Sequence, residues 1–294
     1  VDNISTWAFK GFRGNLMSVE SGNEKYDSRD DCNAIIETAT NTIVAGCINS
    51  TIPSTVTTIG EAAFDGVGFT SIEIPANVTT LDLGAYANNP IYSVFIPETV
   101  TDIWSNPFYG CNELTYITVD PANPNYDSRE DCNAICDSER NWIIATCKSS
   151  VIPTSITSIG TYAFAYREDL NEFKVPSHIN VIYDNAFAYS NLWNITLADN
   201  NNLTIWNWAF AQCKELRTVK MGRGISKIED RVMQGCPKLS NIYINAALAP
   251  KIQSTTFVID DAGTLTTAKV HVPSASLKTY QNANVWRDLN LNLV

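Results

Sequence analysis

The sequence has little histidine, little positive charge and no long apolar run. His178 and His271 are its only histidines among 294 residues, so imidazole-based acid–base or metal chemistry has almost no material. Twenty Lys and Arg stand against 31 Asp and Glu, a net charge of −11, and no basic stripe is present to neutralise phosphates. Nucleic acid is therefore not expected as a partner. No stretch approaches the roughly 20 apolar residues of a membrane helix.

What the sequence does contain is repetition. YDSRDDCNAI at 26–35 returns as YDSREDCNAI at 126–135, and TIPSTVTTIGEAAF at 51–64 returns as VIPTSITSIGTYAF at 151–164. Repetition of this kind indicates a solenoid, in which each short unit buries its apolar face against the next one. We therefore expect one continuous core rather than two ordinary domains.

Short strings of alternating apolar and polar residues recur along the chain. They stand at 69–74, 91–96, 114–119, 170–175, 192–197, 216–221 and 239–244. Alternation of period two predicts a strand with one buried face. The predicted fold class is a β-rich solenoid, with short parallel strands on one face and short turns or helical segments on the other.

A second motif, Ile-x-x-x-x-Phe, recurs between these strings. Examples are Ile59 with Phe64 and Ile159 with Phe164. A large ring at every turn of the coil is expected to stack into an aromatic spine, each burial contributing about 2–3 kcal/mol.

Two β-hairpins, at about 26–50 and 126–150, are expected to interrupt the regular repeat. In the first, 33–38 and 41–46 are predicted strands about a turn at Ala39 and Thr40.

A hairpin centred on that turn places Cys32 opposite Cys47, and the second copy places Cys132 opposite Cys147. Directly opposed Cβ atoms lie within reach of a disulfide. Buried thiols in a reduced protein would look the same in sequence, so both states stay open here.

The unit IP-x-x-V-T-x-I-G-x-x-A-F, followed by C-x-x-L-x-x-I-x-I, resembles the BspA-like leucine-rich repeats of surface and secreted proteins from gut and oral anaerobic bacteria. The resemblance is carried by residues 52–64, 108–119, 152–164 and 210–221, by the insert at 124–135 and by the ending at 270–289. It implies a curved right-handed solenoid, exported or displayed on the cell surface and engaged in adhesion or protein binding, host-matrix proteins included. The repeat motif brings no catalytic residue, cofactor or metal ligand with it. The glycine of the motif, seen as Gly60 and Gly160, is replaced in other rungs by Trp104, Tyr183, Trp206 and Glu229.

The expected domains are a solenoid over 1–273 and a C-terminal cap over 274–294. Within the solenoid the duplicated block runs over about 19–118 and 119–221. Because the chain opens within a repeat, an export signal is expected upstream of Val1, together with an extracellular or cell-surface location. The protein is expected to be a monomer.

Outward positions of the predicted sheet are the candidate binding surface. They include Glu73, Phe95, Tyr116, Thr118, Lys174, Thr196, Lys220, Tyr243 and His271. Exposed rings often anchor interfaces, although strand propensity alone also favours them.

Four tryptophans form a further candidate surface, because rungs near the middle carry indoles where neighbouring rungs carry Gly, Ala or Tyr. They are Trp104, Trp193, Trp206 and Trp208. Indoles stack on sugar rings, and packing between rungs explains them as well.

Two acidic clusters suggest either calcium binding or turn capping. They are Asp27, Asp30 and Asp31 in the first insert and Asp127, Glu130 and Asp131 in the second. Each contains an arginine and begins a strand, which favours turn capping.

The function predicted from these features is a non-enzymatic binding module for a protein or glycoprotein. Its alternatives are a structural spacer and a glycan-binding surface protein. An enzyme would need a nucleophile, base and orienting group at a recognisable spacing, and the sequence offers none.

Overall fold

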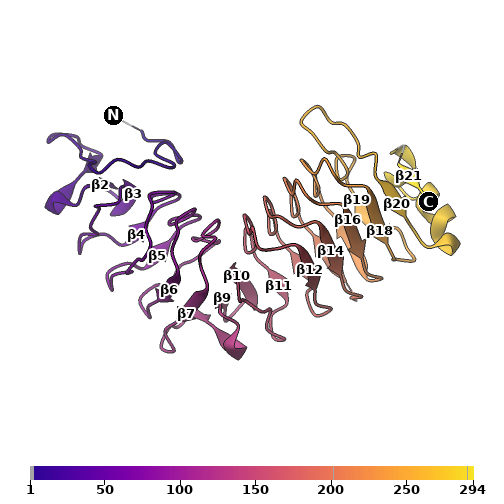
Figure 1. Ribbon diagram of the computed structural model, residues 1–294, viewed down its shortest axis with the longest axis horizontal. Coiled ribbons are helices and arrows are strands. Elements are labelled where there is room, and N and C mark those ends of the chain that lie inside the picture. The colour runs from indigo at the N-terminus through magenta and orange to yellow at the C-terminus, as the bar shows by residue number, and fades with distance from the viewer. Residues whose placement is uncertain (1–2, 201, 290) are drawn as a thin grey trace. The chain divides into compact units, whose positions relative to one another are not determined.

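The computed structural model describes residues 3–200, 202–289 and 291–294 (Figure 1). Its internal contacts divide the chain into two compact units, Val1–Pro153 and Thr154–Val294. In each unit successive coils place strands side by side, so that equal positions of the repeat pair with one another. The predicted β-rich solenoid is confirmed in both units.

The C-terminal unit contains two parallel sheets. The first has the order β12 (Glu172–Val175), β14 (Asn194–Leu197), β16 (Thr218–Met221), β18 (Asn241–Ile244), β20 (Lys269–His271) and β21 (Asn292–Leu293). The second contains β11 (Ser158–Ile159), β13 (Val181–Ile182), β15 (Leu203–Ile205), β17 (Ile225–Ile228) and β19 (Lys251–Ile252). The second sheet consists of the isoleucines of Ile-x-x-x-x-Phe and their neighbours, a place where the sequence predicts turns.

The N-terminal unit repeats this arrangement with fewer strands. They are β4 (Thr58–Ile59), β5 (Thr80–Leu81), β6 (Ser93–Ile96) and β7 (Tyr116–Val119). The strand predicted at 69–74 is wrong, because that segment has no strand pairing. At the start of this segment the Asn89 side-chain oxygen accepts the backbone N–H groups of Gly68 and Phe69, at 2.7 and 3.0 Å.

Both predicted hairpins are present in the N-terminal unit. The first comprises β1 (Tyr26–Asp27), the 3-10 turn η1 (Arg29–Asp31), β2 (Ala34–Glu37) and β3 (Thr42–Gly46). The second comprises β8 (Tyr126–Asp127), η2 (Arg129–Asp131), β9 (Ala134–Asp137) and β10 (Trp142–Thr146).

The arginine of each acidic cluster organises the start of its hairpin. Arg29 donates from Nη2 to Asp27 Oδ2, at 2.7 Å, and from Nη1 to Asn41 Oδ1, at 2.9 Å. The hydrogen bonds to Arg29 lower the pKa of the Asp27 carboxyl below its ordinary value. The cluster therefore closes a turn through its own arginine, and Arg129 and Asp127 repeat the pair at 2.7 Å.

A bulge shifts the register of each hairpin by one residue. Ile36 faces Ile43, as the turn predicts, but Ala34 faces Gly46. The extra residue on the second strand moves every later pair out of the predicted alignment. Cys32 and Cys47 lie beyond this bulge, so the register on which their predicted disulfide rests is wrong.

All eight cysteines of the chain carry buried free thiols in the structure. In the second hairpin the Cys132 sulfur lies 3.6 Å from the sulfur of Cys136, its near neighbour on β9, while Cys147 contacts backbone carbonyls. Cys136, which the pattern of the first copy marks as core, is thus the nearest thiol partner. The Cys132–Cys147 disulfide, like its counterpart in the first copy, stays a prediction.

Thiol labelling distinguishes these states. We expect the unreduced protein, denatured and alkylated, to gain eight labels by mass, because the structure holds eight free thiols. In the native state burial is expected to slow the same reaction strongly. A count of four labels, with Cys32, Cys47, Cys132 and Cys147 unmodified, would establish the hairpin disulfides instead.

The predicted aromatic spine is present inside each unit. In the C-terminal unit Phe187 stacks between Phe164 and Phe210, with ring centroids 5.0 and 5.5 Å away. In the N-terminal unit Tyr86 lies between Phe64 and Phe108, at 5.2 and 6.1 Å.

Phe187→Ala tests the contribution of the spine to stability. Phe187 is fully buried, and truncation leaves a cavity that costs about 3–5 kcal/mol. The urea midpoint of the C-terminal unit, followed by circular dichroism, is expected to fall accordingly. Leu248→Ala, at a side chain 76% exposed, is the control and is expected to change stability by less than about 0.5 kcal/mol. Equal midpoints for the two variants would contradict the role of the spine.

Gly60 is explained by the hairpin beside it. A Cβ at this position would lie 2.9 Å from the Ile43 carbonyl oxygen on β3, closer than side chains tolerate. Trp104, at the equivalent place of another rung, is 67% exposed. Glycine is thus required where the hairpin strand approaches.

The segment after β20 covers the end of the C-terminal unit. It comprises η3 (Ser274–Ser276), α1 (Leu277–Asn282) and η4 (Trp286–Asp288). The buried Tyr280 hydroxyl donates to the Ala246 carbonyl oxygen at 2.8 Å, and the Trp286 indole N–H donates to that of Pro250 at 2.7 Å. These bonds tie the segment to the last coil.

Candidate functional site

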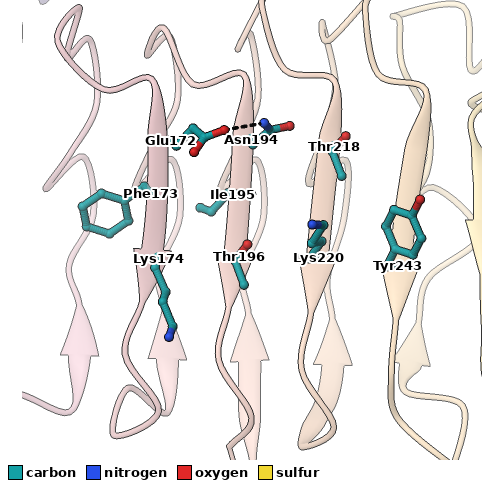
Figure 2. Close-up of a pocket in the computed structure, with 9 residues that line it drawn as sticks. All are labelled: Glu172, Phe173, Lys174, Asn194, Ile195, Thr196, Thr218, Lys220 and Tyr243. Carbon is teal, nitrogen blue, oxygen red and sulfur yellow. Dashed lines mark hydrogen bonds between the residues drawn. The ribbon is translucent and has the colours of Figure 1, made fainter.

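Outward side chains of the first sheet of the C-terminal unit form a regular surface, which we call the lysine face. Two rows run across β12, β14, β16, β18 and β20, because the strands pair in register. One row is Lys174, Thr196, Lys220, Tyr243 and His271, and the other is Glu172, Asn194, Thr218, Asn241 and Lys269. Figure 2 shows several of these side chains on neighbouring strands.

The lysine face contains an open depression of about 560 Å³. Its lining includes Lys174, Thr196, Lys220 and Tyr243 (Figure 2). The alternate residues of the same strands point inward, and Ile195 among them is buried. The inward side chains of these strands thus belong to the core, and most of the outward side chains that form the face are polar.

The interactions found within the lysine face join side chains other than its lysines. The Asn194 amide donates to Glu172 Oε1 at 2.9 Å. The His271 ring stacks on Tyr243 with centroids 4.2 Å apart, and its Nε2 lies 3.0 Å from Asn241 Oδ1.

The charge of the chain is divided unevenly between its units. Residues 154–294 hold 13 Lys and Arg against 11 Asp and Glu, a charge of +2, whereas residues 1–153 hold 7 against 20, a charge of −13. None of the ion pairs found among the described residues involves Lys174, Lys220 or Lys269. The lysine face is therefore a cationic surface on an acidic protein.

Phe95 and Tyr116 lie in the N-terminal unit, on the paired strands β6 and β7. Their side chains are 53% and 52% exposed, and Tyr92 contacts Tyr116 edge-on with centroids 5.5 Å apart. This surface is a small aromatic patch.

Trp104 lies beside the second hairpin of the N-terminal unit. The Arg140 guanidinium is 5.3 Å from the Trp104 ring centroid and 5.5 Å from that of Trp142, a cation–π arrangement. Arg140 also pairs with Asp137 at 2.8 Å, and this hydrogen bond raises the pKa of the guanidinium. The Ile103 N–H donates to the Tyr126 hydroxyl at 2.6 Å. Tyr126 and Trp104 both line a depression of about 460 Å³.

Trp206 follows β15 in the second sheet of the C-terminal unit. It stacks on Tyr183 with centroids 5.9 Å apart, and Lys227 Nζ lies 5.9 Å from its ring. Packing between coils therefore accounts for its position, and it is not brought together with the lysine face residues.

The sequence-based candidates are thus divided among several surfaces. The structure brings together Lys174, Lys220 and Tyr243 on the lysine face, and Phe95 and Tyr116 on the paired strands β6 and β7. Sequence reasoning that takes one outward residue from each strand misses the second row of the face, including Lys269. Period-two alternation could have identified the second row, because each of its residues stands two positions before a first-row residue on the same strand.

A family model described as the BspA type leucine-rich repeat region matches this chain in six copies, over residues 44–130 and 144–260. The protein is a leucine-rich repeat protein, and it belongs to the BspA type family. No curated protein matches the chain.

Solved bacterial structures share the fold. A leucine-rich repeat protein from Eubacterium ventriosum is 21% identical with a TM-score of 0.56, over 65% of this chain and 58% of its own. The pneumococcal vaccine antigen PcpA is 17% identical with a TM-score of 0.53, over 82% of this chain and 66% of its own. The chain thus spans less than two thirds of either protein.

The described residues contain no helix of the length and apolarity that crossing a bilayer requires. They also contain no group of three or more His, Cys, Asp or Glu side chains placed to hold a metal ion.

Proposed function

We propose that the protein is a non-enzymatic binding module that recognises an extracellular macromolecule through the lysine face. The observation that carries the proposal is a polar, solvent-open surface on a rigid sheet whose three lysines have no ion-pair partner in the described part of the chain. Side chains held on paired strands are well placed before a ligand arrives, which lowers the cost of binding.

The family supports this function, because leucine-rich repeats serve protein interactions and stacked coils present an extended surface. An extracellular or cell-surface location and a role in adhesion belong to the same proposal. One structural neighbour is a pneumococcal vaccine antigen.

A binding screen followed by a steric block tests the proposal. The chain is screened against an array of extracellular-matrix proteins and glycans, and each hit is titrated against Thr196→Trp. The new indole stands in the middle of the depression and is expected to weaken binding at least about tenfold, or about 1.4 kcal/mol.

Thr204→Trp is the matched control, since Thr204 is a half-buried outward residue of β15 in the second sheet. It is expected to keep affinity within about twofold. Equal losses in the two variants would reject the lysine face as the binding surface. An array with no hit would favour the structural spacer.

A further inference from the structure

The lysines of the lysine face recur on alternate strands. Lys174 stands on β12, Lys220 on β16 and Lys269 on β20, and each successive pair is separated by one strand without a lysine. Because neighbouring strands lie about 4.8 Å apart, Lys174 and Lys220, which share a row, are about 10 Å apart, and Lys269, in the other row, is about 12 Å from Lys220. A ligand that contacts all three needs anionic groups at a similar interval.

These ammonium groups are available to a ligand. Lys174, Lys220 and Lys269 are exposed, and Glu172 is the one acidic member of the face. The Glu172 carboxylate accepts the Asn194 amide, and none of the ion pairs among the described residues joins it to a lysine. An anion bound between the lysines would relieve their mutual repulsion and gain charge-assisted hydrogen bonds.

The groups between the lysines suit sugars. Thr196, Thr218 and Asn241 are half-buried and carry hydroxyl or amide groups that both donate and accept hydrogen bonds, as sugar hydroxyls do.

An extended peptide fits this surface less well. The inner strands β14, β16 and β18 are paired on both sides, so their backbones offer no edge for an added strand. The inward residues Ile195, Val219 and Ile242 are buried, so they offer little apolar surface to peptide side chains.

We infer that the lysine face binds an acidic polysaccharide that carries one anionic group, a carboxylate or a sulfate, in each disaccharide. This inference rests on the proposed function and names its ligand class. An extended polysaccharide advances by about one disaccharide between successive lysines, so its acids match their interval.

The test measures binding of the full chain to four probes. Hyaluronan octasaccharide carries one carboxylate per disaccharide, keratan sulfate oligosaccharide carries sulfate without carboxylate, chitooligosaccharide is neutral, and polyglutamate is an acidic peptide. Either acidic glycan is expected to bind, and its affinity is expected to fall as NaCl rises from about 50 to about 500 mM. Which of the two binds identifies the anionic group.

Substitutions locate the site. The pair K174Q and K220Q, made together, is expected to lower affinity for the acidic glycan at least about tenfold, and K174R with K220R is expected to retain most of it. Lys251→Gln is the matched control, because Lys251 is an exposed outward lysine on β19 of the second sheet. It is expected to stay within about twofold of the original affinity.

Four outcomes would contradict the inference. Equal or tighter binding of chitooligosaccharide or polyglutamate would overturn the inference, as would equal losses in Lys251→Gln and the double variant. Binding of neither acidic glycan would overturn it too, while the proposed function would stand if an array hit still loses affinity in Thr196→Trp. If Thr196→Trp also left the affinity for the array hit unchanged, the inference and the proposed function would both be rejected.

Discussion

Pairing between equal positions of successive coils is the constraint on which the structure depends. Each strand places its residues beside the same positions of its neighbours, so one type of side chain is repeated across the sheet. Inward, this alignment stacks Phe164, Phe187 and Phe210 into a dry spine. Outward, the same alignment places Lys174 and Lys220 in one row. The core and the candidate site are thus two sides of one ladder.

This division leaves the outer residues open to change. Inward positions must fill a shared interior, where a missing ring leaves a cavity. Outward positions need only tolerate a strand, so charge and hydroxyl groups at Lys220 or Thr196 cost the fold little. Where another element comes close, that freedom ends, and Gly60 is held small by the carbonyl oxygen of Ile43. The close approach of β3 therefore excludes a tryptophan at position 60.

Much of the fold follows from patterns in the sequence. Alternation identified β6, β7, β12, β14, β16 and β18 because each keeps one face in the core. The 69–74 segment has the same alternation but forms no strand, since alternation reports burial and not pairing. The hairpin turn was placed correctly, but a bulge between Ile35 and Ile36 shifts the register on the side of Cys32 and Cys47. A bulge leaves no period in the sequence.

The sequence by itself determined the repeat, the buried isoleucines and rings, and the family, because burial imposes a period that single residues display. Only the tertiary structure decided which outward residues share a surface. Lys174 and Lys269 are far apart in the chain, and no local pattern relates them. They meet on one face because each coil returns the backbone to the same sheet, so that strand pairing sets the interval between them.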